Sequence, residues 1–125
     1  MEALFKQMED FAKENKVPII NENGRKVFIE IIKKYKPQRV LEIGTAIGYS
    51  ALLTTYYGAE NAKIISLELD EERAKQAQDF INQSAAFVRA IWAGRLSVCF
   101  LRRIRSIFFQ NFCSDSRALR GEFGG

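Results

Sequence analysis

The chain has 125 residues, a formal net charge of +4 and 47% hydrophobic residues. This length allows one domain with a modest core, and we expect no membrane-spanning helix because no apolar run reaches about 18 residues. Two cysteines that lie far apart argue against a disulfide scaffold or a zinc site, and the acidic, amphipathic N-terminus is not typical of a secretory signal, so we expect a cytoplasmic protein.

Two amphipathic helices are predicted before the first strand, over residues 2–15 and 24–35. Apolar residues recur along both at helical spacing. A loop containing Pro18 separates the helices, and Pro37 stops the second one. The residues that we expect in the core rather than at a site are Met8 and Phe11 of the first helix and Val27, Phe28, Ile31, Ile32 and Tyr35 of the second.

The centre of the sequence is the stretch V-L-E-I-G-T-A-I-G-Y-S at residues 40–50. It has the pattern of a buried strand, placed at residues 39–43, followed by a glycine-bearing turn and the start of a helix. Gly44 and Gly48 allow the backbone to pass close to a ligand, and the start of the helix offers unpaired N–H groups. The stretch therefore predicts a nucleotide-type binding turn.

A second strand and a further helix complete a βαβ pattern. The helix after the turn runs from Tyr49 to about residue 57, the second strand covers residues 63–67, and a helix follows over residues 70–84. Strand, helix and strand of these lengths predict a right-handed crossover and a parallel sheet. Asp70 is a suitable N-cap for the last helix.

Two acids are candidate ligands. Glu68 follows the second strand, where an acid in a βαβ nucleotide site accepts hydrogen bonds from ribose hydroxyls; the alternative is a solvated acid before a helix. Glu42 lies within an apolar strand, where a lone buried carboxylate costs free energy unless it is hydrogen-bonded. Its alternative is an acid exposed at a strand end.

The segment E-I-G-T-A-I-G-Y-S resembles the first motif of class I S-adenosylmethionine-dependent methyltransferases. More narrowly, it is similar to small O-methyltransferases of the catechol and caffeoyl-CoA type, including bacterial enzymes that methylate hydroxyuridine in tRNA. The resemblance covers roughly residues 8–84. It implies a truncated α/β fold, a Rossmann-like three-layer sandwich with helices on both faces of a short parallel sheet, and strand order 3-2-1 if a third strand forms.

The resemblance also implies how S-adenosylmethionine is bound. Glu42 would lie under the cofactor, and Ser50 would bond the methionine carboxylate, although a plain serine at a helix start is an equal alternative. The glycines would shape the turn, while Thr45 and Ala46 would contact the cofactor through backbone only. The predicted cofactor-binding set is Glu42, Gly44, Thr45, Ala46, Gly48, Tyr49, Ser50 and Glu68.

Catalytic parts that the resemblance implies are missing from the sequence. Related enzymes bind a divalent metal (Mg²⁺) with acids after the fourth strand and a later Asp-Asn pair. After Asp79 the only acids are Asp115 and Glu122, and the chain has no histidine. We therefore assign no metal ligand and no catalytic residue. The implied reaction is methyl transfer to a hydroxyl of a small molecule or of tRNA hydroxyuridine, and we expect this chain to be weakly active or inactive.

The composition changes near residue 85. Residues 1–85 carry 12 basic and 13 acidic groups, and residues 86–125 carry 7 and 2, so their net charges are −1 and +5. We interpret the first part as the N-terminal half of a methyltransferase domain and the second as an aberrant or poorly structured basic tail. A reading-frame shift is the favoured cause; a divergent short variant and a separate basic module are the alternatives. Residues 87–92 could form a third strand, and Arg102, Arg103 and Arg105 are a weak candidate for binding RNA.

Three further expectations concern partners and rival functions. Without a fourth strand, the first strand keeps an unpaired apolar edge that favours self-association, such as a homodimer. A non-catalytic fragment that binds S-adenosylmethionine is one rival function. An NAD-type oxidoreductase is the other, and it is disfavoured because Ala46 and Tyr49 stand where its G-x-G-x-x-G fingerprint would need glycine.

Overall fold

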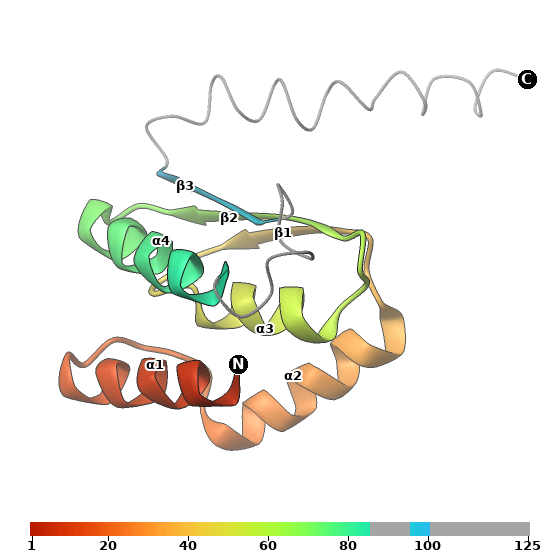
Figure 1. Cartoon of the computed structure of the whole chain (residues 1–125), viewed down its shortest axis with the longest axis horizontal. Coiled ribbons are helices and arrows are strands. Elements are labelled where there is room, and N and C mark those ends of the chain that lie inside the picture. The colour runs from red at the N-terminus through yellow and green to blue at the C-terminus, as the bar shows by residue number, and fades with distance from the viewer. Residues whose placement is uncertain (86–95, 101–125) are drawn as a thin grey trace, which may run out of the picture.

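The computed structural model describes residues 1–85 and the strand at 96–100 (Figure 1). In chain order its elements are α1 (Glu2–Glu14), α2 (Glu22–Tyr35), β1 (Arg39–Ile43), α3 (Tyr49–Tyr57), β2 (Lys63–Glu68), α4 (Glu71–Ala85) and β3 (Leu96–Phe100).

Most boundaries agree with the sequence prediction to within one residue, and two N-caps explain where helices begin. Helix α2 begins two residues earlier than predicted because the side chain of Asn21 accepts a hydrogen bond of 2.8 Å from the backbone N–H of Gly24. Asp70 caps α4 as predicted, since its carboxylate accepts from the N–H of Arg73 at 3.0 Å.

The three strands form a parallel sheet in the order β1-β2-β3, which confirms the predicted topology. Leu41 of β1 is in register with Ile65 of β2, which is in register with Ser97 of β3. The third strand lies later than the predicted 87–92, a segment outside the described residues. The residues L-S-V-C-F begin a longer stretch that mixes apolar and Arg residues without a clean period, so they were not predicted as a separate strand.

All four helices lie on one face of the sheet (Figure 1). The sequence predicted helices on both faces of the sheet, whereas the described part of the chain has helices on one face only. The cause is chain order: right-handed crossovers that advance from β1 to β2 to β3 place α3 and α4 on the same side. Helices α1 and α2 form a further layer beneath them.

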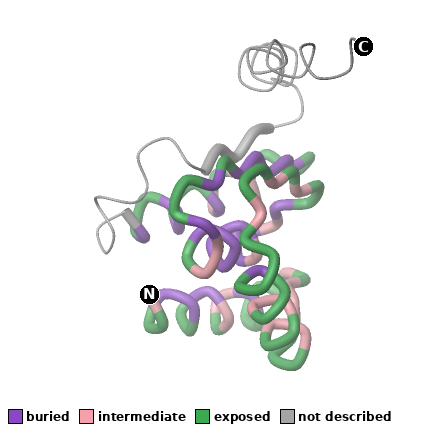
Figure 2. The backbone as a smooth tube through the Cα atoms, turned by 90° about the vertical axis from the view of Figure 1, so that its right-hand side faces the viewer, coloured by how far each residue is buried: buried purple, intermediate pink, exposed green. Residues whose placement is uncertain are grey.

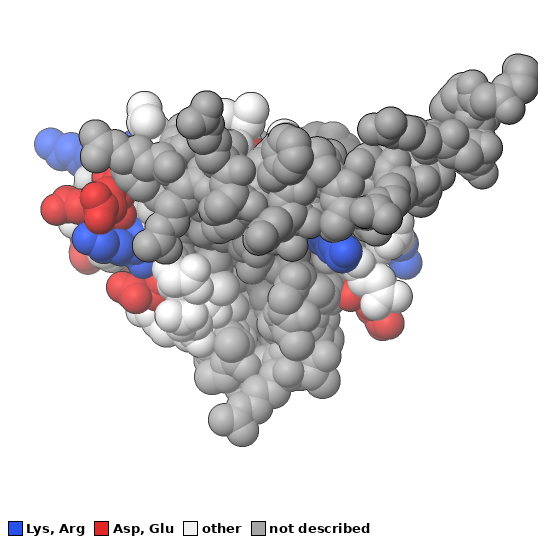
Figure 3. Space-filling model, turned by 90° about the horizontal axis from the view of Figure 1, so that it is seen from above, with Lys and Arg blue, Asp and Glu red and all other residues white. Residues whose placement is uncertain are grey.

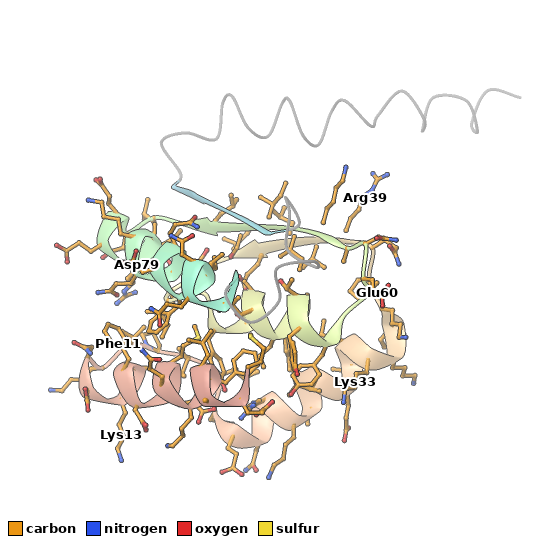
Figure 4. All side chains as sticks on the ribbon, in the orientation of Figure 1. Phe11, Lys13, Lys33, Arg39, Glu60 and Asp79 are labelled. Atoms are coloured by element: carbon orange, nitrogen blue, oxygen red, sulfur yellow. The ribbon has the colours of Figure 1, made fainter. Side chains whose placement is uncertain are left out.

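The core lies between α1, α3 and α4. Buried residues gather where these helices meet each other and the sheet, and exposed residues line the outer faces of α1 and α2 (Figure 2). Phe11 points from α1 toward α4, where its ring meets Phe80 edge-to-face at 5.5 Å, whereas Lys13 points away (Figure 4). The buried cluster comprises Leu4, Phe5, Met8, Ala12, Ile47, Tyr49, Leu52, Leu53, Phe80 and Ile81.

The predicted core face of α2 is only partly correct. Ile32 is buried and Phe28 packs against the core cluster, but Val27, Ile31 and Tyr35 are exposed. Helix α2 lies in the outer layer and contacts the rest of the molecule along a narrow stripe. The apolar stripe read from the sequence is wider than the face that this position buries.

The face of the sheet opposite the helices leaves apolar side chains of β1 accessible. Leu41 is 44% exposed and Ile43 is 79% exposed. Within the described residues, β1 has a strand partner on one side only. None of the described helices combines the length and hydropathy needed to cross a membrane.

Candidate functional site

The turn between β1 and α3 is tied to the end of β2. The backbone N–H groups of Gly44 and Thr45 both donate to the carbonyl of Leu67, at 2.8 and 3.1 Å. Three of the five turn residues, Gly44, Ala46 and Gly48, have positive φ, at 94°, 48° and 85°. A left-handed conformation at alanine is uncommon, so another contact must hold Ala46 in place.

That contact comes from Glu68, the last residue of β2. One carboxylate oxygen accepts from the N–H of Ala46 at 2.7 Å, and the other accepts from Leu69 and Asp70 at 2.8 and 2.9 Å. The residue is 7% exposed. A carboxylate has about four acceptor positions, so Glu68 keeps about one for a ligand. Glu68 was predicted from the sequence as a ribose ligand, and its hydrogen bonds to the turn were not predicted.

Glu42 lies at the centre of a hydroxyl network. The hydroxyls of Ser50 and Ser66 donate to its two oxygens, and Ser66 shares a hydrogen bond of 2.6 Å with Thr45. This network satisfies a half-buried carboxylate that would otherwise be costly inside the fold. It also engages Ser50, so a ligand carboxylate at Ser50 would have to replace Glu42 as its partner.

A cavity of about 250 Å³ opens above the turn. Five of the eight predicted residues line it. The other three are outside its lining: Glu68 accepts from Ala46, Glu42 accepts from Ser50, and Gly48 faces α4. The opposite wall of the cavity is the loop before α2, which was not predicted as part of the site. The signal in the sequence was the apolar run that follows Pro18. The full lining is Pro18, Ile19, Ile20, Gly44, Thr45, Ala46, Tyr49 and Ser50.

The two glycines have different surroundings. A Cβ at Gly44 would meet nothing within 4 Å, so this side of the turn is open. A Cβ at Gly48 would lie 3.3 Å from the Cβ of Ala77 in α4. Gly44 therefore leaves backbone accessible to a ligand, and Gly48 permits close packing of the turn on α4.

The described part of the chain contains no group of three or more His, Cys, Asp or Glu residues placed to hold a metal ion. The Arg102, Arg103 and Arg105 candidate for RNA binding lies outside the described residues. Seen from above, acidic and basic side chains of the described residues lie close together at both ends of the visible surface (Figure 3).

Residues 2–95 match the model of a family described as O-methyltransferase. A tRNA1(Val) (adenine(37)-N6)-methyltransferase of Serratia proteamaculans is 41% identical over 61 residues, which cover 49% of this chain and 21% of that protein.

Solved structures share the fold. A methyltransferase from Geobacter sulfurreducens superposes with a TM-score of 0.67 at 14% identity, over 78% of this chain and 48% of that one. An O-methyltransferase from Bacillus cereus, solved in complex with SAH, gives 0.65 at 18% identity, over 82% and 48%. The chain thus spans less than half the length of these relatives.

Proposed function

The chain belongs to the O-methyltransferase family, and we propose that it binds S-adenosylmethionine in the turn between β1 and α3. The observation that carries this proposal is the contact between Glu68 and Ala46, which brings the acid of the second strand against the glycine turn of the first. Ligands of open α/β sheets bind at the carboxyl ends of the strands, where this turn lies. The Bacillus cereus relative was solved with the product form of the same cofactor.

Each part of the site has a proposed role. The free acceptor position of Glu68 would take a ribose hydroxyl, and the open backbone at Gly44 would lie against the cofactor. Glu42 and Ser50 would exchange their mutual hydrogen bond for bonds to the amino and carboxylate groups of the methionine portion. Thr45, Ala46 and Tyr49 would complete the wall.

The proposed activity of the complete enzyme is methyl transfer to a hydroxyl oxygen. When bound, the cofactor would supply an electrophilic methyl group: the acceptor oxygen would bond to the methyl carbon as the bond between that carbon and the sulfonium sulfur breaks, S-adenosylhomocysteine would leave, and the hydroxyl proton would pass to solvent. The acceptor is a small hydroxyl compound or a hydroxyuridine in tRNA, and a divalent metal such as Mg²⁺ would lower the pKa of that hydroxyl. We propose a cytoplasmic location. The match to an adenine N6-methyltransferase covers only 61 residues and does not decide the acceptor.

A calorimetric titration tests the proposal. We expect S-adenosylhomocysteine to bind the 125-residue chain and NAD not to bind, because Ala46 and Tyr49 occupy the positions of the fingerprint glycines. Binding of NAD alone would overturn the proposal in favour of an oxidoreductase. Methyl transfer from labelled cofactor to catechols and to tRNA should be weak or absent with this chain, and binding without turnover would favour the non-catalytic fragment.

We also propose that copies of the chain associate through β1. Its apolar side chains are exposed and one of its edges has no strand partner among the described residues, a combination that favours pairing with another strand. Sedimentation over a concentration series should show a rising mass, and replacing Leu41 and Ile43 by lysine should keep the chain monomeric. Leu69→Lys is the matched control, because Leu69 is 73% exposed but lies after β2. Association unchanged in the double variant would refute the proposal.

A further inference from the structure

A hydrogen-bonded network joins the first three helices beside the proposed cofactor site. Tyr49, the first residue of α3, is 2% exposed and donates its hydroxyl hydrogen bond to Glu9 of α1. The same oxygen of Glu9 pairs with Arg25 of α2 at 3.2 Å. The other terminal nitrogen of Arg25 pairs with Glu2 at 2.8 Å. One carboxylate of α1 therefore holds the starts of both following helices.

The surroundings of Tyr49 keep its hydroxyl protonated, so that it donates a hydrogen bond to Glu9. Burial, with a further contribution from the hydrogen bond to Glu9, raises the pKa of Tyr49 well above its ordinary value. The ring packs edge-to-face on Phe5 at 5.8 Å, and the guanidinium of Arg25 stacks over the same Phe5 at 5.4 Å. The side chain is thus fixed by packing along its length and by Glu9 at its tip.

Tyr49 connects this network to the binding turn. It lines the cavity above the turn, follows Gly48 directly, and precedes Ser50. The first N–H groups of a helix have no partner within the helix and point toward a ligand at its N-terminus. The direction of these groups depends on the rotation of α3 about its axis, and a fixed side chain at the first residue sets that rotation.

Glu9 and Arg25 are also placed behind the opposite wall of the cavity. They line a second hollow of about 700 Å³, which shares Ile19 and Ile20 with the cavity above the turn. The network therefore includes the start of α3 through Tyr49 and, through Glu9 and Arg25, lines a hollow that the apolar loop also lines.

We infer that Glu9 is a positioning residue for the cofactor, acting through the hydroxyl of Tyr49 on the start of α3, with Arg25 holding Glu9 in place. The inference rests on the proposed function, because it presumes a cofactor at this turn. Glu9 contacts neither the turn nor the cavity above it, and it lies 40 residues before Tyr49 in the sequence. A purely structural tie between α1 and α3 would stabilise the fold without changing ligand affinity.

The test measures affinity for S-adenosylhomocysteine and the melting temperature of the full chain in parallel. Tyr49→Phe removes one hydroxyl and keeps the packing, and Glu9→Ala removes its acceptor. Each is expected to weaken affinity about five- to tenfold, because part of the free energy of a hydrogen bond to a charged group is lost from ligand binding and the rest from the stability of the fold. The double variant should bind no more weakly than Glu9→Ala, because Glu9→Ala already removes the hydrogen bond that Tyr49→Phe removes.

Glu2→Ala is the matched control: Glu2 pairs with the same arginine but contacts no residue of the turn, so its affinity should stay within about twofold. Wild-type affinity in Tyr49→Phe and Glu9→Ala, even with a lower melting temperature, would overturn the inference. An equal loss in Glu2→Ala would overturn it too, by showing a general effect of the network. If the unmodified chain binds no S-adenosylhomocysteine, the proposed function itself fails, and this inference with it.

Discussion

Replacing Glu68 by alanine is expected to abolish measurable binding of S-adenosylhomocysteine and to lower the free energy of unfolding by about 3 kcal/mol. The variant removes the acceptor of three backbone N–H groups, those of Ala46, Leu69 and Asp70. Each buried donor left unpaired costs about 1–3 kcal/mol, reduced where water can reach it. The loss also releases Ala46 from the left-handed conformation in which its hydrogen bond to Glu68 holds it.

The matched control for this variant is Asp70→Ala, two residues away. It removes the N-cap of α4, whose carboxylate accepts from the backbone N–H of Arg73, and should cost about 1 kcal/mol without changing affinity. Calorimetric titration and urea denaturation of both variants separate the two roles. If Glu68→Ala binds S-adenosylhomocysteine as the unmodified chain does, Glu68 only shapes the turn and is not a ribose ligand.

The parts of the fold that local sequence fixes were predictable. The apolar strand at 39–43, the paired glycines and the strand at 63–67 depend on residue types and spacing within a few positions, and all appear where expected. The parallel pairing of β1 and β2 followed from the strand–helix–strand pattern, and the strand order followed from the family resemblance. The third strand was predicted too early in the chain because residues 96–100 lie in a longer stretch that mixes apolar and Arg residues, which obscures their alternation.

The inner structure of the site was not predictable, because it depends on side chains that meet across long sequence separations. Glu68 reaches back 22 residues to Ala46, and Ser66 reaches back 24 residues to Glu42. No local pattern indicates which oxygen pairs with which donor. The sequence therefore identified the acids as unusual, but it could not show that Glu42 and Glu68 already carry intramolecular partners.

The exposure of one apolar face of α2 was also not predictable from the local sequence. Periodicity reports that Val27, Ile31 and Tyr35 share a face of the helix, but it does not report which layer the helix occupies. In an outer layer only the neighbouring stripe, which includes Ile32, reaches the core.

Gly44 and Gly48 are proposed to have different roles, Gly48 in the packing of the fold and Gly44 in ligand binding. Both have positive φ, so alanine at either position adds about 1–2 kcal/mol of backbone strain. Only Gly48 has a close neighbour: its new methyl group would lie 3.3 Å from the Cβ of Ala77, tighter than ordinary contact. At Gly44 the methyl group would enter open space that we assign to the cofactor.

We therefore expect Gly48→Ala to have the larger effect on the free energy of unfolding, and Gly44→Ala to have its main effect on ligand affinity. Gly48→Ala should lower the free energy of unfolding by about 2–3 kcal/mol, because strain and crowding against α4 add. Gly44→Ala should lower it by about 1–2 kcal/mol from strain alone, yet weaken affinity for S-adenosylhomocysteine at least about tenfold, because the added carbon occupies ligand space. Urea denaturation and calorimetric titration measure both quantities. If Gly44→Ala keeps its affinity, the open space beside Gly44 is not where the cofactor lies.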